Sequence, residues 1–217
     1  MTRTYILVEG QTEEAFVNEL LIPHYARIGL YLTPIIVSTS PGHKGGVVNY
    51  QKIKPQILRL CKQDRNSYVS TMFDLYALPS NFPGKSHPNY LTHNTGTQKA
   101  HFLEQHLKQD IQQVNFIPNL IVHEFEALLF TNPETFNQWV DDITIVNRLK
   151  SINRQYVSPE DINDGPLTAP SKRIIENMPE YQKTVHGPLI ACDIGLDAIR
   201  QSCPHFHEWL NTLEALP

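Results

Sequence analysis

The fold is decided by the stretch Thr4-Tyr5-Ile6-Leu7-Val8-Glu9-Gly10-Gln11-Thr12-Glu13-Glu14. Its apolar run predicts a short buried strand that ends on Glu9, and Gly10 then turns the chain into a helix that carries Glu13 in its first turn. In open α/β folds, the groups that handle ligands gather at the carboxyl ends of strands. The Glu9 carboxylate therefore has a physical reason to face a ligand.

Further strands and helices alternate after this stretch. Strands are expected at residues 3–8, 31–37, 68–73 and 116–122, and apolar residues at helical spacing predict helices between them. We expect the first helix to kink or end at Pro23. This alternation is typical of a Rossmann-type α/β core, with a mainly parallel four-stranded sheet flanked by helices. Right-handed crossovers would bring Glu9 and Asp74, which end two of these strands, to the same edge of the sheet.

The chain divides into two predicted parts. Residues 1–132 form the α/β core, and residues 133–217, which are punctuated by prolines, form a helical C-terminal extension packed on that core. The last predicted helix begins near Pro204 and has one apolar face. Two of its residues, His205 and His207, are expected at the surface because their spacing places them on different faces.

Composition narrows the class of protein. Hydrophobic residues make up 41% and charged residues 18% of the chain, which is typical of a globular protein. A net charge of −4 argues against broad capture of nucleic acid, although it allows a local basic groove. Three scattered cysteines, the absence of a signal peptide and the absence of a membrane-length apolar run predict a cytoplasmic protein without membrane contact.

Acidic residues form the main candidate metal site. A hard divalent cation such as Mg²⁺ or Mn²⁺ prefers oxygen ligands, which carboxylates at the ends of adjacent strands can supply. Complementing the helix dipole is an alternative role for first-turn acids. A helix would separate Glu124 from Glu126, whereas a strand would place them on one face, and His123 is a supporting residue. The candidate metal ligands are Glu9, Glu13, Asp74, Glu124 and Glu126.

Two basic stretches are candidates for binding phosphate. The glycine-rich loop at residues 40–46 carries Lys44 and can present backbone N–H groups to an anion, although a plain loop is an equal alternative. A helix is expected to begin near residue 168, with Thr168 as its cap. Lys172 and Arg173 oppose the dipole at this helix start, so an anion bound there would explain them. Two solvated basic residues are the competing interpretation.

The N-terminal stretch resembles the Toprim fold, the metal-dependent module of topoisomerases, primases and overcoming-lysogenization-defect (OLD) nucleases. That family has a glutamate after its first strand and an Asp-x-Asp pair after its third. Glu9 and Asp74 match the first members, and Glu13 matches a second glutamate of the nuclease branch. The chain differs from the family pattern at Tyr76, which occupies the position of the second aspartate. Two-metal chemistry would then require Glu124 or Glu126 to replace the missing ligand.

Over nearly its whole length, the chain also resembles a bacterial family of Toprim-like proteins of unknown function that are often associated with ATPase partners. The likeness is carried by residues 71–74, 123–130, 162–166 and 169–173. The resemblance implies a nuclease-like role, in defence against phage beside an ATP-driven partner.

These observations lead to one main functional hypothesis, a Mg²⁺- or Mn²⁺-dependent phosphodiesterase acting on DNA or RNA. The acidic residues would hold the metal, with Glu13 as second ligand or general base, and Lys172 would stabilise charge on the phosphate. Lys44 could assist Lys172. Two alternatives fit the same residues: a non-catalytic regulatory or adaptor subunit of an ATPase complex, which Tyr76 favours, and a hydrolase of a small phosphoester.

Overall fold

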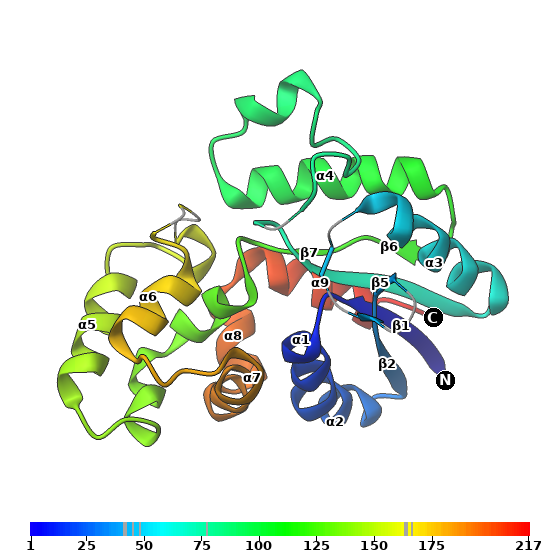
Figure 1. The fold of residues 1–217 in the computed structure, drawn as a ribbon. Helices are drawn as coiled ribbons and strands as arrows, with labels where there is room; N and C mark the ends of the chain where they lie inside the picture. Colours follow the sequence, from blue (N-terminus) through cyan, green and yellow to red (C-terminus); the bar gives the residue numbers. More distant parts are fainter. Residues whose placement is uncertain (41–42, 45, 48, 77, 163–164, 166) are drawn as a thin grey trace.

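The structure is a computed structural model that describes the chain apart from residues 41–42, 45, 48, 77, 163–164 and 166, and apart from the side chains of residues 39, 40, 43 and 44. Its central sheet has the strand order β2-β1-β5-β6, with β7 also paired to β5 (Figure 1). Every pairing in this sheet is parallel, so the predicted α/β class is confirmed. The strands are β1 (Thr2–Val8), β2 (Leu30–Ile36), β5 (Ser67–Asp74), β6 (Phe116–Ile117) and β7 (Leu120–Ile121). A small antiparallel pair, β3 (Ser38–Ser40) and β4 (His43–Lys44), lies apart.

The predicted fourth strand is split into β6 and β7. Between them, the Asn119 backbone N–H donates to Thr71 Oγ1 at 3.0 Å, and the Thr71 hydroxyl donates to the Asn119 carbonyl at 2.8 Å. Side-chain hydrogen bonds therefore replace the backbone ladder at the break, next to Pro118, which has no N–H to donate.

The sequence predicted that the first helix would kink or end at Pro23; the helix does not end there, and a π-helical segment precedes the proline. The chain runs through α1 (Gln11–Phe16), a π-helical segment η1 (Val17–Leu21) and α2 (Ile22–Ala26). Pro23 lies in the first turn of α2, where a missing N–H is tolerated because the wider π turn precedes it.

The sheet is covered on both faces, and its residues alternate between two apolar cores. Ile6 and Val8 of β1 pack on one side with α1, α2 and the C-terminal helices, whereas Leu7 packs on the other with α3 and α4. The helices on that second side are α3 (Tyr50–Gln63), α4 (Gly96–Ile111) and the 3₁₀ turn η2 (Pro88–Thr92). The prediction of amphipathic crossover helices agrees with this layering (Figure 1).

The C-terminal part shares the first core with the sheet. Helix α7 packs on α1, and Trp209 of α9 donates its indole N–H to Ser70 Oγ of β5 at 2.9 Å. The elements after β7 are η3 (Phe125–Thr131), η4 (Pro133–Gln138), α5 (Ile143–Asn153), η5 (Pro159–Asp161), α6 (Pro170–Asn177), α7 (Lys183–Ile194), α8 (Leu196–Ser202) and α9 (Pro204–Glu214). Residues 133–217 therefore share one hydrophobic core with residues 1–132. None of the helices that the structure describes has the length and apolar character needed to cross a bilayer.

Candidate metal centre

The centre is built on the carboxyl ends of two adjacent strands. Glu9 follows β1 and Asp74 ends β5, and these strands pair in parallel up to Val8 and Met72. Glu9 Oε2 accepts the Asp74 backbone N–H at 3.3 Å, while Glu9 Oε1 accepts the Val47 backbone N–H at 3.4 Å. The structure thus places Glu9 and Asp74 together at the predicted edge.

Glu13 joins this edge from the first turn of α1. Its Oε2 accepts the Gly10 N–H at 2.7 Å, so it caps the helix, and its side chain is buried. Burial and the charge of Glu9 raise the pKa of Glu13 to about 7. Both interpretations of a first-turn acid therefore apply to Glu13: it stabilises the helix start and faces the other carboxylates.

Glu124 and Glu126 reach the centre by a geometry that is neither the predicted helix nor the predicted strand. His123 has a φ of 63°, a left-handed conformation that turns the chain sharply after β7. Glu124 is then extended, and Glu126 lies in the 3₁₀ turn η3. The turn is tied to the sheet because the Phe125 N–H donates to Asp74 Oδ1 at 3.0 Å. Both glutamates are buried and point to one side chain, Lys183.

Lys183 is a candidate site residue that the sequence did not reveal. Its Nζ lies 3.4 Å from Glu124 Oε2 and 3.3 Å from Glu126 Oε2, and its side chain keeps 43% of its exposure. Burial alone would lower the pKa of Lys183, but the two glutamates and Asp74 raise it, so it stays an ammonium. No local motif marks Lys183, because only the packing of α7 against α1 brings it here.

Negative charge is concentrated beyond what one lysine can balance. Burial, followed by the charges of Glu13, Glu9, Glu126 and Glu124, raises the pKa of Asp74 well above its usual value. Burial likewise raises the pKa of Glu9 and of Glu126, although Lys183 opposes the shift at Glu126. Clusters of this kind are found at functional sites, where a bound cation relieves the repulsion.

The donor atoms fit a hard divalent cation. All five carboxylates offer oxygen, which Mg²⁺ and Mn²⁺ prefer to nitrogen or sulfur. Glu126 Oε1 is fully buried and makes no hydrogen bond of normal geometry among the described residues, and its buried neighbour is the Tyr181 hydroxyl, whose pKa burial and Glu126 both raise. An unpaired buried carboxylate oxygen is costly unless a cation or ordered water satisfies it. Within the described part of the chain, ligand atoms within 4.8 Å of one another are found for His101, Glu104 and His205 and not for the sheet-edge carboxylates, so Glu9, Asp74 and Glu126 would have to draw closer together to share an ion.

The predicted basic residues do not join the centre as expected. Lys172 lies on the exposed side of α6, and Arg173 donates to the Thr168 carbonyl at 2.7 Å and to the Tyr156 hydroxyl at 3.1 Å. Arg173 thus holds its own loop. The backbone of Lys44 lies in β4, but its side chain is outside the described part of the chain.

The start of α6 differs from the prediction in an informative way. Ala169, not Thr168, is the N-cap, and no side chain caps the helix. Instead, the Ser171 backbone N–H donates to Glu124 Oε1 at 2.6 Å and the Ser171 hydroxyl donates to Glu124 Oε2 at 3.0 Å. The anion expected at this helix start is the carboxylate of Glu124.

Tyr76 supports the backbone and leaves its ring exposed. Its N–H donates to the His123 carbonyl at 2.9 Å, while 46% of the residue is accessible to solvent. The chain after β5 therefore lacks the second acid of the Asp-x-Asp pattern. Glu124 and Glu126, which follow the neighbouring strand β7, bring carboxylates to the same edge of the sheet.

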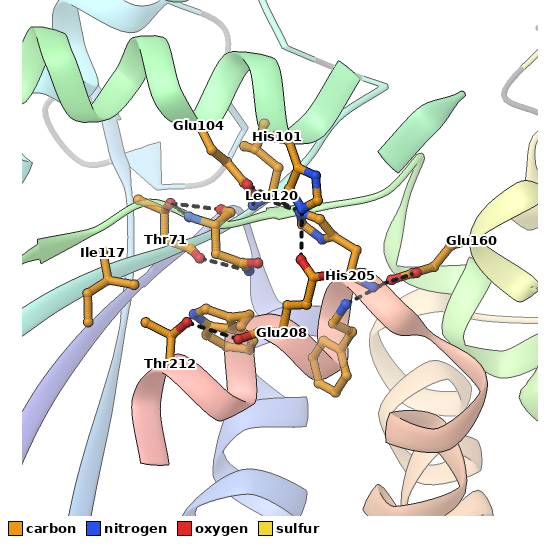
Figure 2. A network of polar contacts seen from close by, with 12 residues as sticks. Thr71, His101, Glu104, Ile117, Leu120, Glu160, His205, Glu208 and Thr212 are labelled. Carbon is orange, nitrogen blue, oxygen red and sulfur yellow. Dashed lines mark hydrogen bonds and ion pairs between the residues drawn. The ribbon is translucent and has the colours of Figure 1, made fainter. Parts of the chain in front are cut away.

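A second group corrects the prediction that His205 lies at the surface. His205 is only 4% exposed, and its ring meets His101 and Glu104 of α4 in an arrangement that could hold a metal ion (Figure 2). The i, i+2 spacing of His205 and His207 excluded a shared face, but it could not show that one of them is buried under another helix.

The fold and the first cluster define an α/β protein with a candidate metal centre at the carboxyl edge of its parallel sheet. Residues 8–214 match the protein family described as "Domain of unknown function (DUF4276)", and the chain belongs to this family. It is similar, at 15% identity and a TM-score of 0.39, to a solved structure described as "C-terminal region of the Xanthomonas campestris pv. campestris OLD protein phased with mercury". That alignment covers 99% of this chain and 98% of the other. No curated protein matches the sequence significantly.

Proposed function

We propose that this protein is a divalent-metal-dependent phosphodiesterase that acts on nucleic acid. The observation that carries the proposal is the convergence of Glu9, Asp74 and Glu126 at one sheet edge, with the Lys183 ammonium beside them. Carboxylates that hold a cation next to a partly exposed lysine are the groups that phosphoryl transfer requires.

Glu9, Asp74 and Glu126 would hold Mg²⁺ or Mn²⁺, and Glu124 would stay bound to Ser171 and Lys183. Such a cation, when bound, lowers the pKa of water and shields the charge of the phosphate. The backbone N–H groups of Val47 and Phe125 orient the carboxylates of Glu9 and Asp74. The centre is thus organised before substrate arrives, which is the condition for effective electrostatic catalysis.

Two residues have roles in proton and charge handling. Glu13 lies in the first turn of α1 beside Glu9, so it is placed to accept a proton from the attacking water, although its raised pKa belongs to the metal-free protein and a bound cation would lower it. Its Oε2 is occupied by the Gly10 N–H, which leaves Oε1 for the proton. Lys183 would contact the phosphate, the role that the sequence suggested for Lys172, because its partly exposed ammonium lies inside the cluster and Lys172 does not.

A polar surface pocket that reaches His123, the residue before Glu124, supports a substrate larger than a lone phosphate, although Asp161 also lines it. It has a volume of about 400 Å³ and lies next to His123, which follows β7. Lys99 lines it together with the polar start of α4. A strand of nucleic acid whose phosphate sits at the carboxylates could continue into this pocket, with Lys99 supplying positive charge.

A regulatory subunit of an ATPase complex, acting in phage defence, is the second candidate. Tyr76 favours it, because the Asp-x-Asp pair is incomplete and an exposed tyrosine suits a protein contact. The two candidates differ in one measurable property. An enzyme loses both metal binding and cleavage when Asp74 becomes Asn, whereas an adaptor shows no cleavage with any metal.

The proposal is tested by incubating purified protein with Mn²⁺ and labelled single- and double-stranded DNA and RNA. We expect cleavage that Asp74→Asn and Glu9→Gln remove, and that the matched control Glu14→Gln, on the same helix turn as Glu13, retains. Cleavage that persists in Asp74→Asn would show that another site or a contaminant is responsible. Absence of cleavage of every substrate, with intact Mn²⁺ binding, would favour the adaptor or a small phosphoester, which substrate screening would separate.

A further inference from the structure

Helices α4 and α9 each carry a histidine and a glutamate that face the other helix. This group of side chains is separate from the carboxylate centre. Helix α4 carries His101 and Glu104, and α9 carries His205 and Glu208, so each pair has the i, i+3 spacing that places both side chains on one helix face. Figure 2 shows the four side chains pointing into the space between the helices. The site lies near Leu120, at the start of β7, whereas the carboxylate centre follows the end of that strand.

The donor atoms of three of these residues are close enough to share one ion, and Glu208 contacts one of the three. His205 Nε2 lies 3.0 Å from Glu104 Oε1, and His101 Nε2 lies 2.9 Å from Glu208 Oε2. Ligand atoms of His101, Glu104 and His205 all fall within 4.8 Å of one another. Zinc bonds of about 2.0–2.2 Å in a tetrahedron separate the ligand atoms by roughly 3.3 Å, so small side-chain adjustments would suffice.

The site is held in place by hydrogen bonds from the surrounding backbone. Glu104 Oε1 accepts the Leu120 N–H at 2.7 Å. The carboxylate of Glu160 accepts the backbone N–H groups of His205 and Phe206 at 2.9 and 3.0 Å, which fixes the start of α9. Outer partners of this kind orient the ligands in metal sites. A pocket of about 150 Å³, which these side chains line, connects the site to solvent.

The four side chains bring together the donor types that a transition metal takes. The rings of His101 and His205 have their centroids 4.8 Å apart, and each ring contacts one carboxylate, His205 that of Glu104 and His101 that of Glu208. One divalent cation would take two imidazole nitrogens and two carboxylate oxygens in place of these two contacts.

We propose that His101, Glu104, His205 and Glu208 form a second metal site, which takes a zinc-class transition metal and fastens α9 to α4. Two imidazole nitrogens and two carboxylate oxygens suit Zn²⁺, whereas Mg²⁺ prefers oxygen alone. The ion links the last helix of the chain to a helix of the α/β core. The site is therefore structural and independent of the phosphodiesterase proposal.

The test uses the full-length protein, freed of metal and titrated with Zn²⁺ in a calorimeter and with Co²⁺ in an absorption spectrometer. The main variant is His101→Ala with Glu208→Gln, because these side chains are 47% and 61% exposed and their loss should leave the fold intact. His207→Gln, on the same helix as His205, is the matched control. Asp74→Asn removes the other centre and tests independence.

We expect wild type, His207→Gln and Asp74→Asn to bind Zn²⁺ at this site and to show the Co²⁺ bands of tetrahedral coordination. The double variant should lose about 100-fold or more in affinity, since it lacks two ligands, and should lose those bands and the thermal stabilisation by Zn²⁺. Unchanged binding in the double variant, binding lost only in Asp74→Asn, or no binding by wild type would each overturn the proposal. Metal-dependent cleavage would still be tested separately, because only Asp74→Asn affects the carboxylate centre.

Discussion

Replacing Glu13 with glutamine should stabilise the metal-free protein at alkaline pH. Glu13 is buried among carboxylates, and its pKa rises from 4.5 to about 7. A carboxyl whose pKa is raised on folding contributes stability below its unfolded pKa and loses that contribution as pH rises through the folded pKa. Ionised Glu13 therefore destabilises the fold at pH 8.

The magnitude follows from the rise of the Glu13 pKa from 4.5 to about 7. At 1.36 kcal/mol per unit, the full penalty above pH 7 is about 3 kcal/mol. Because neighbouring carboxylates share the repulsion, we expect Glu13→Gln to recover about 1–3 kcal/mol at pH 8. The glutamine carbonyl can still accept the Gly10 N–H, so the helix cap is retained.

The assay is thermal and urea unfolding in EDTA at pH 8 and pH 5. At 2–4 °C per kcal/mol for a chain of this size, the melting temperature should rise by about 2–12 °C at pH 8 and by less at pH 5. Glu14→Gln removes an equal charge from the same turn and should change little. A Glu13→Gln protein that is less stable than wild type at pH 8, or equally affected at both pH values, would refute the reasoning.

Two further predictions concern the lysines and the close packing near the centre. Lys183→Met should reduce the kcat of metal-dependent cleavage of one oligonucleotide by about 100-fold or more, whereas Lys172→Met should leave kcat within about threefold of wild type. Equal losses in the two variants would contradict the assignment of the phosphate contact to Lys183. Gly96→Ala should lower the free energy of unfolding by about 1–3 kcal/mol in urea, because the added Cβ would lie 2.6 Å from Val122 Cγ1 and 2.8 Å from His123 Nε2. A Gly96→Ala protein as stable as wild type would show that this contact relaxes freely.

Local sequence patterns were sufficient for the strand-end part of the centre. The apolar runs before Glu9 and Asp74 identify parallel strands, and parallel strands place their carboxyl ends at one edge. These inferences need no knowledge of distant packing. The first turn of the helix after Gly10 locates Glu13 for the same reason.

The remaining parts depend on tertiary structure. Lys183 enters through the packing of α7 on α1, and the left-handed turn at His123 sets the direction of Glu124 and Glu126. Neither leaves a periodic signal in the sequence. His205 shows the same limit, because its burial depends on α4, which lies far away in the chain. Periodicity reports which residues share a face and does not report what covers that face.

The central claim is that the carboxylates after β1, at the end of β5 and in η3 hold one divalent cation. Its most direct test is a crystal soaked in Mn²⁺, with anomalous diffraction used to locate the metal. The account predicts an anomalous peak in contact with Glu9, Asp74 and Glu126 that is absent from an Asp74→Asn crystal. A peak elsewhere only, or the same peak in both crystals, would contradict it.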